Sequence, residues 1–341
     1  MQIGIDSFVP KRILPGSDDS AGNEQRVREL LEEIELADRV VLDVFGIGEH
    51  HRPEYVSSSP AILLAAAAAR TMRIRLASAV TVLSSDDPVR VFQQFATVDL
   101  ISGGRAEIIV GRGSFIESYP LFGFDLDDYD ELFAEKLQLL LKIREQTHVE
   151  WKGKYRAALT GQGVYPRPVQ NPLPVWIGVG GTPNSFVRAG TLGLPLAVAI
   201  IGGEPHRFRP LVDAYREAGK RAGHASEKLQ VSVHSIGFVG ETTEQAAEDF
   251  YPSYREAFNR IGKERGWPPV SRGQFDATRA PGGALVVGDV AAVAEKVLRV
   301  NEVLGGISRM TILLGAGVME HGLVMRGVEL MAEVREKVSR V

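Results

Sequence analysis

The sequence predicts a (β/α)8 barrel, an α/β fold class that rests on three observations. Short apolar, β-branched runs alternate with longer helical patterns along all 341 residues, which is typical of βαβ units around a parallel sheet. About eight such units can be counted. An open dinucleotide-binding sheet would carry G-x-G-x-x-G after its first strand, but residues 6–10 read DSFVP there. Closure into a barrel is therefore favoured over an open sheet.

The expected strands and helices follow from the same pattern. We predict strands at 2–6, 45–49, 74–81, 106–110, 175–179, 195–199, 230–239 and 309–314. A polar residue followed by proline presets the first turn of a helix, and three helices should begin in this way, at Ser59-Pro60, Asp87-Pro88 and Thr182-Pro183. Residues 132–143 place apolar side chains about 3.6 residues apart, so this helix should cover the outside of the sheet.

Nothing in the composition divides the chain. No glycine- or serine-rich linker and no repeat of 20 to 50 residues is visible, so we expect a single domain spanning residues 1–341. Three longer stretches lack periodicity, at 114–128, 150–174 and 263–288. In a barrel, such stretches are expected to be lids or loop insertions over the active face. The identity of the substrate should depend on residues 114–128, 202–206 and 263–288.

Composition excludes several function classes. Lys and Arg number 39 against 43 Asp and Glu, without a long basic run, so a nucleic-acid partner is disfavoured. The longest apolar run, 61–69, is too short to cross a membrane, and the N-terminus reads as a strand and not as a signal peptide. A cytoplasmic location is the resulting expectation. Because there are no cysteines, redox chemistry must come from an organic cofactor or a non-thiolate metal.

Glu49-His50-His51 lies at the end of the second predicted strand, where barrel enzymes place catalytic groups. Adjacent strand residues point to opposite faces, so only one of the two histidines should face the barrel axis. Such a histidine could act as proton donor, acceptor or cofactor neighbour. A two-histidine metal site is the alternative, but no histidine has a partner two positions away. We predict no metal site.

Two glycine-containing segments could hold a planar, phosphate-bearing ligand. Arg112, between Gly111 and Gly113 after the fourth strand, could reach a phosphate or could be a structural ion-pair residue. Residues 175–185 run from a strand through Gly180 and Gly181 into a helix start, where free N–H groups and the helix dipole favour an anion. Thr182 and Ser185 could add hydroxyl donors, or Thr182 could only cap its own helix.

Other catalytic classes lack their motifs. No Walker lysine follows the glycines, and no Gly-x-Ser-x-Gly elbow occurs, so nucleotide triphosphatase and serine hydrolase sites are disfavoured. His234 and His321 could each line a pocket, but a lone histidine is more often structural. We predict no function for either.

Taken together, the ordered motifs resemble the luciferase-like flavin monooxygenase superfamily, which includes bacterial luciferase and coenzyme F420-dependent reductases. The motifs are Glu49-His50-His51, the strand at 77–83, residues 87–90, residues 102–105 with 111–113, and residues 174–178. The resemblance covers most of residues 1–200 and continues more weakly to the last strand and helix. It implies a (β/α)8 barrel with a flavin at the carboxyl ends of the strands.

The resemblance also implies roles for single residues. The flavin phosphate would be held by Arg112 and by the turn carrying Gly180, Gly181, Thr182 and Ser185. His50 would be the catalytic residue beside the flavin. A non-prolyl cis peptide beneath the flavin ring would fall at Ala79-Val80.

This chain departs from luciferase at Arg52-Pro53-Glu54, where luciferase has an aromatic residue, so an aldehyde substrate and light emission are not inherited. Its Glu-His-His is closer to the FMN branch than to the F420 branch. The leading hypothesis is a monooxygenase that uses reduced FMN from a separate flavin reductase, with O2, on a small organic substrate. Alternatives are F420-dependent hydride transfer, a non-catalytic flavin-binding protein and a metal-dependent hydrolase. A homodimer is expected.

Overall fold

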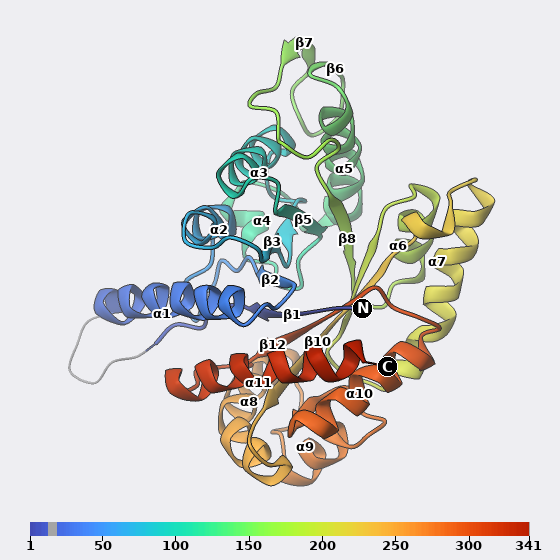
Figure 1. Cartoon of the computed structure of the whole chain (residues 1–341). Helices are drawn as coiled ribbons and strands as arrows, with labels where there is room; N and C mark the ends of the chain where they lie inside the picture. Colours follow the sequence, from blue (N-terminus) through green and yellow to red (C-terminus); the bar gives the residue numbers. More distant parts are fainter. Residues whose placement is uncertain (13–18, 341) are drawn as a thin grey trace.

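A closed ring of parallel strands forms the centre of the molecule in the computed structural model, which describes residues 1–12 and 19–340 (Figure 1). The eight barrel strands, in order around the ring, are β1 (Gln2–Ser7), β2 (Val44–Ile47), β3 (Arg75–Ser78), β5 (Ala106–Gly111), β8 (Val175–Val179), β9 (Leu196–Ile200), β10 (Val231–Val239) and β12 (Arg309–Leu314). All their pairings are parallel, and β10 closes the ring by pairing with both β9 and β12. The predicted barrel fold is confirmed.

Helices surround this ring (Figure 1). They are α1 (Asp19–Arg39), α2 (Pro60–Ala68), α3 (Pro88–Ser102), α5 (Tyr129–Glu145), α6 (Pro183–Thr191), α7 (Arg209–Arg221), α8 (Thr243–Arg265), α10 (Val290–Val303) and α11 (His321–Ser339). The three helices predicted from a polar residue before proline all form. Only α3 has the expected side-chain cap, because Asp87 accepts hydrogen bonds from the N–H groups of Val89 and Arg90.

Seven of the predicted strands agree with the structure to within about two residues, and the third differs. The stretch predicted as one strand at 74–81 is interrupted after Ser78, and a short strand β4 (Thr81–Val82) resumes beside β5. The Ala79–Val80 peptide bond between them is cis, as the family resemblance implied.

The three long insertions have different positions. Residues 114–128, which contain the short helix α4 (Ser118–Leu121), reach the carboxyl ends of the strands, as predicted. The insertion at 150–174 only partly meets its prediction, because Arg156 donates to Asp87 at the start of α3, on the carboxyl side of the barrel, at 3.1 Å. This segment completes the antiparallel hairpin of β6 (His148–Trp151) and β7 (Leu159–Gly163). It then passes the amino end of β5, where the Gln170 side chain donates to Ala106 O at 2.8 Å.

The insertion at 263–288 only partly meets its prediction. Most of it, including α9 (Arg272–Arg279) and β11 (Val286–Gly288), packs against α8 in a separate apolar cluster around Phe250 and Phe275. Its first residues do reach the carboxyl side of the barrel, because Arg265 donates to Ser114 O at 3.3 Å.

A buried ion pair lies inside the barrel toward its amino end. Arg309 of β12 donates to Glu107 of β5 across the barrel at 2.6 Å, and both side chains are buried. The Arg309 guanidinium also lies 4.6 Å from the ring centre of Trp176. Arg309 and Arg75 hold the pKa of Glu107 below its usual range, against the effect of burial. Charge and apolar side chains therefore fill the amino end of the barrel.

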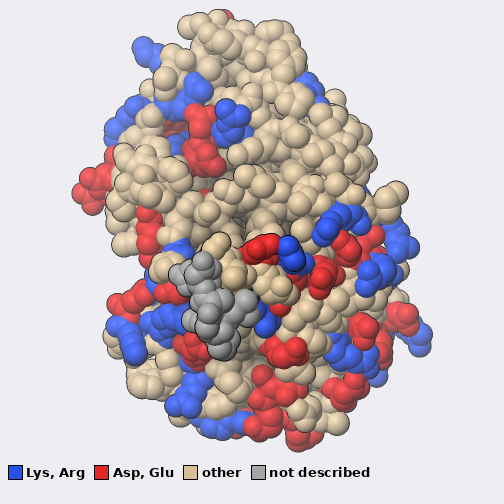
Figure 2. All heavy atoms as spheres, turned by 90° about the vertical axis from the view of Figure 1, so that its left-hand side faces the viewer, with Lys and Arg blue, Asp and Glu red and all other residues tan. Residues whose placement is uncertain are grey.

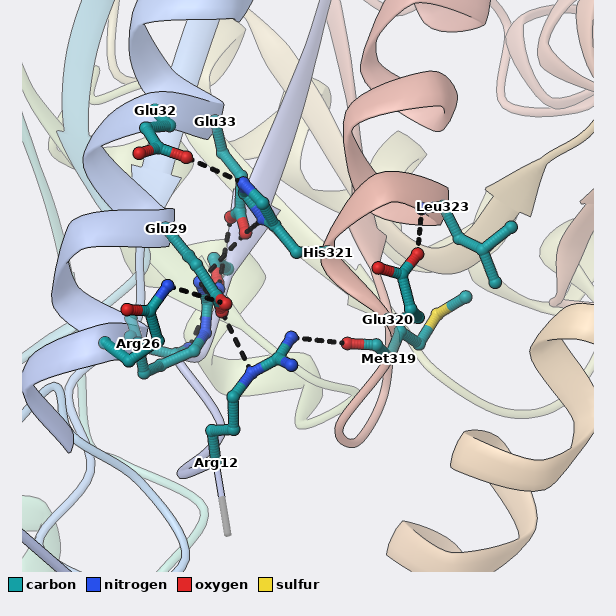
Figure 3. Close-up of polar contacts among 12 residues, drawn as sticks. Arg12, Arg26, Glu29, Glu32, Glu33, Met319, Glu320, His321 and Leu323 are labelled. Atoms are coloured by element: carbon teal, nitrogen blue, oxygen red, sulfur yellow. Dashed lines mark hydrogen bonds and ion pairs between the residues drawn. The ribbon is translucent and has the colours of Figure 1, made fainter. Parts of the chain in front are cut away.

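Polar contacts join the last helix to the first, as Figure 3 shows. His321 at the start of α11 contacts Glu32 of α1 at 2.9 Å, and Arg26 contacts Glu33 of α1 at 2.8 Å. Arg12 joins the same cluster through Glu29 at 3.1 Å. His321 therefore has a structural position between two helices, consistent with its being set aside as a functional residue.

One outer face of the barrel carries unusually few charges. In Figure 2, Lys, Arg, Asp and Glu gather over the lower part of the face, whereas its upper part is largely uncharged. On α2 and α3, which lie on this side in Figure 1, Ile62 is 66% exposed and Leu100 and Ile101 are each 47% exposed. In the described part of the chain, no helix combines the length and apolar character needed to cross a membrane.

Candidate active site

A cavity of about 510 Å³ opens at the carboxyl ends of the barrel strands. This volume falls in the range of small-molecule sites, and the carboxyl face is where barrel enzymes hold their active sites. Its walls include residues from β1, β4, β5, β8, β9, β10 and β12. Among the lining residues are Asp6, Glu49, His50, His51, Ala79, Val80, Arg112, Gly180, Gly181, Thr182, His234 and Thr311.

Val80, after the cis peptide, lies between two strands of the cavity wall. A Cβ atom added at Gly111 would lie 2.7 Å from Val80 Cγ2, and one at Gly178 would lie 2.7 Å from Val80 Cγ1. Both glycines are therefore required by the close approach of this side chain. The sequence reasoning assigned Gly111 to close approach of a ligand, but its nearest neighbour is Val80. Together with Ala79, Val80 gives the cavity an apolar wall.

Arg112 brings the two predicted phosphate-binding segments together. Its Nη2 donates to Thr182 Oγ1 at 3.5 Å and to Ser185 Oγ at 3.4 Å, so it spans from the end of β5 to the start of α6. Arg112 also forms an ion pair with Asp130, whose side chain is 70% exposed. An ion pair with so exposed a partner contributes about 0–1 kcal/mol, so an anion at this point can compete with Asp130.

The start of α6 offers further groups for an anion. Thr182 occupies the N-cap position but makes no side-chain cap hydrogen bond, so the alternative that it only caps its own helix is wrong. A Cβ atom at Gly180 or Gly181 would meet nothing within 4 Å, which leaves the backbone of this turn exposed to the cavity. Uncapped N–H groups, the helix dipole, two hydroxyls and a guanidinium thus converge on one place.

Both His50 and His51 line the cavity, contrary to the prediction that only one would. The reason is that β2 ends at Ile47, so strand alternation no longer governs these residues. Glu49 holds the segment in place, because its carboxylate contacts His51 Nε2 at 2.9 Å and accepts a hydrogen bond from Val82 N at 3.0 Å. The Glu-His-His segment is thereby tied to the strand that follows the cis peptide.

Three aromatic side chains surround His50. Its ring centre is 4.6 Å from Phe8, 4.5 Å from Tyr55 and 5.5 Å from Phe115. Burial, together with the positive charges of His51 and Arg52, lowers the pKa of His50 to about 3. The imidazole is therefore neutral at physiological pH. Its Nε2 atom is buried and has no hydrogen-bond partner among the described residues, so it is free for a ligand.

Sequence reasoning missed one functional cluster. His234 of β10 lines the cavity, and its Nδ1 lies 2.6 Å from Asp6 Oδ2 at the end of β1. Thr311 of β12 donates its hydroxyl to the same carboxylate oxygen. Strand alternation marks Asp6, His234 and Thr311 as polar residues within apolar strands, but their meeting depends on strand order and register.

The fold and the cavity define a barrel with a site suited to a planar ligand that carries an anionic group. The chain belongs to the luciferase-like monooxygenase family, whose model matches residues 4–306. This membership supports an oxidoreductase, and it confirms the family resemblance found in the sequence.

Curated relatives include a monooxygenase and an F420-dependent dehydrogenase. The chain is 28% identical to 4-hydroxyprotoasukamycin monooxygenase from Streptomyces nodosus subsp. asukaensis, with 83% of this chain and 80% of that protein covered. It is 30% identical to F420-dependent glucose-6-phosphate dehydrogenase from Amycolatopsis mediterranei, over 45% of this chain and 48% of that protein. An uncharacterized protein from Sinorhizobium fredii is 29% identical, and the match covers 67% of this chain and 66% of that protein.

Solved structures share the whole barrel. Monooxygenase RslO1 from Streptomyces bottropensis superposes with a TM-score of 0.85 at 22% identity, covering 98% of each chain. The oxygenating constituent of 3,6-diketocamphane monooxygenase from Pseudomonas putida, in complex with FMN, has a TM-score of 0.79 at 20% identity, covering 99% of this chain and 98% of that one. At these identities the similarity shows the fold.

Proposed function

We propose that this protein is an FMN-dependent monooxygenase that acts on a small organic substrate. The observation that carries the proposal is the convergence of Arg112, Thr182, Ser185 and the uncapped start of α6 beside a large, partly apolar cavity. A phosphate is the kind of group that such a set of donors binds. The chain thus has the two features that FMN requires, a phosphate site and space for a ring.

These residues would hold the cofactor. Arg112, the two hydroxyls and the backbone at Gly180 and Gly181 would hold the phosphate, and Ala79 and Val80 would lie against the ring. Reduced FMN, when bound, supplies the electrons that activate O2, so that one oxygen atom is transferred to the substrate and the other leaves as water.

The protein's own part in the reaction is to exclude water and control protons. Phe8, Tyr55 and Phe115 shield His50 from solvent, so that its ring stays neutral and Nε2 is available as a hydrogen-bond partner in the cavity. A neutral imidazole can accept or return a proton without placing a fixed positive charge beside the reacting groups.

Reduced FMN would come from a separate flavin reductase. One relative is named as the oxygenase component of a flavin-dependent trigonelline monooxygenase, and a similar structure is the oxygenating constituent of a larger system. Both names describe the oxygenating part of an enzyme, which supports a second protein as the source of the reduced flavin. The lack of a nicotinamide-binding fingerprint in this chain agrees with that division.

Comparison of cofactor binding tests the proposal. Purified protein would be titrated with FMN and with F420, each oxidised and reduced, and we expect at least tenfold tighter binding of FMN. Clear preference for F420 would establish the hydride-transfer alternative. Enzymatic supply of reduced FMN under 18O2, followed by mass spectrometry of candidate substrates, tests oxygen transfer. Turnover unaffected by His50→Ala would contradict the catalytic role of His50.

We also propose that the weakly charged face pairs two copies of the chain. A shallow groove there runs between α2 and α3, lined by Ala61, Ile62, Ala65 and Tyr165 among others. Exposed apolar side chains on one face favour association. Analytical ultracentrifugation should show a dimer that Ile62→Lys dissociates; a wild-type monomer would contradict it. The cytoplasmic location stays a prediction.

A further inference from the structure

The wall of the cavity that carries Asp6 holds a second histidine. His234 projects from β10, between β9 and β12, and its side chain is 14% exposed. Phe8 stacks on its ring with 5.8 Å between the ring centres, and the same Phe8 contacts the His50 ring edge to face at 4.6 Å. One aromatic ring therefore contacts two imidazoles that line the same cavity.

The hydrogen bonds fix which nitrogen of His234 carries the proton. An ionised carboxylate only accepts hydrogen bonds, so both Nδ1 of His234 and the hydroxyl of Thr311 donate to Asp6 Oδ2. In the neutral ring, Nε2 is then the acceptor. Nε2 is buried and has no partner among the residues that the structure describes. A buried polar atom without a partner costs about 1–3 kcal/mol, which a ligand group can offset.

The fold makes specific room for this arrangement. A Cβ atom at Gly46 would lie 2.0 Å from Asp6 Oδ1, so only glycine at this position of β2 leaves space for the carboxylate. The residues paired with His234 on the two neighbouring strands are Ala199 and Thr311, and neither is ionisable. Asp6 is therefore the charged group that faces His234 directly, and His50 is the titratable group beyond Phe8.

We infer that His234, oriented by Asp6, is the base that binds and deprotonates an acidic hydroxyl of the substrate, which makes the substrate class phenols or enols. The inference rests on the proposed function, because it names the substrate class of the same cavity. The O–H bond breaks, its electron pair stays on the substrate oxygen, and the proton bonds to Nε2. The Asp6 carboxylate compensates the charge of the imidazolium that forms.

Proton removal serves the proposed reaction. A phenolate or enolate carries more electron density on its ring or α-carbon than the neutral form, so it is a better acceptor of an electrophilic oxygen atom. His234 is thus assigned to the substrate, whereas the roles proposed for His50 and Arg112 concern the cofactor. The two assignments can be tested separately.

The test uses 4-nitrophenol, whose phenolate absorbs visible light more strongly than the neutral phenol. The FMN-loaded protein would be titrated with this probe between pH 5 and 9, with difference spectra against protein without probe. For wild type we expect the ionisation midpoint of the bound probe to lie at least one pH unit below that of the free probe, a tenfold shift in the proton equilibrium.

Three variants and one control variant separate the role of His234 from a structural one. His234→Phe and His234→Gln should bind the probe but return its midpoint to the free value or above. Asp6→Asn should raise the midpoint by most of the same amount, because it removes the charge that stabilises the imidazolium. His148→Gln, at an exposed histidine of β6 outside the cavity, should behave as wild type.

Three results would overturn the inference: no binding of the probe to wild type, an unshifted midpoint in wild type, or a shift that persists in both His234 variants. Flavin absorbance of the same samples reports FMN binding independently. Loss of FMN binding with an intact shift in apoprotein would refute the proposed cofactor and leave the role of His234 standing.

Discussion

Burial of a neutral histidine makes the stability of this protein pH-dependent in a specific window. The pKa of His50 is about 3 in the folded protein, against 6.5 for the ordinary side chain. Between these values the unfolded chain binds a proton that the folded chain does not. The stabilising contribution is therefore fully present above pH 6.5 and is lost as pH falls.

The size of the effect follows from the shift. Each pH unit below 6.5 removes about 1.4 kcal/mol, so His50 alone should lower the free energy of unfolding by about 2 kcal/mol between pH 7.5 and pH 5. Because pH 5 is still well above the folded pKa, the ring stays neutral in the folded protein throughout this range. The folded structure itself should not change.

Urea unfolding at several pH values, followed by circular dichroism, measures this contribution. His50→Gln and His50→Phe remove the titrating group, so each should lose about 2 kcal/mol less than wild type over the same interval. Other titrating groups cancel in the comparison. His148→Gln, at an exposed histidine of β6, should keep the wild-type slope. If the free energy of unfolding depends on pH equally in wild type and in both His50 variants, the His50 ring is not held neutral by the aromatic side chains around it.

Two further predictions concern the frame of the site. Gly178→Ala should lower the free energy of unfolding by about 1–3 kcal/mol, since its Cβ atom would lie 2.7 Å from Val80. Gly180→Ala, where a Cβ atom meets nothing within 4 Å, should have little effect on urea unfolding. Equal effects of the two substitutions would contradict the close packing of Val80 against Gly178. Arg309→Met should leave the buried Glu107 carboxylate with Arg75 as its remaining cationic partner, so it should cost less than the roughly 3–5 kcal/mol of a fully unpaired buried charge. Adding Glu107→Leu should recover part of that loss, and a double variant as unstable as the single one would refute the argument.

Much of the fold could be predicted because the barrel strands are short apolar runs bounded by turns. The ends of β8 and β12 were predicted to the residue. The third strand was predicted too long, because its interruption depends on a cis peptide that leaves no pattern in apolar residues. The 150–174 insertion was placed correctly only in part, since composition does not tell which end of the barrel each part of a loop covers.

The candidate site was predictable where one local pattern brings donors together. Thr182 and Ser185 lie one helical turn apart, and Arg112 follows a neighbouring strand, so all three meet. The Asp6–His234 pair is 228 residues apart in sequence, and only closure of the barrel brings it together. Such a contact is visible from sequence only when strand order and register are already known.

The central claim is that a phosphate is held by Arg112 and the start of α6, and a comparison of FMN with riboflavin tests it most directly. Dissociation constants would be measured by flavin fluorescence for wild type, Arg112→Gln and, as a control, Arg207→Gln at an exposed arginine. A lost charged hydrogen bond costs about 1.5–3 kcal/mol, so Arg112→Gln should weaken FMN binding roughly 10- to 150-fold and leave riboflavin binding unchanged. Equal affinity of wild type for FMN and riboflavin, or equal loss of both in the variant, would contradict the account.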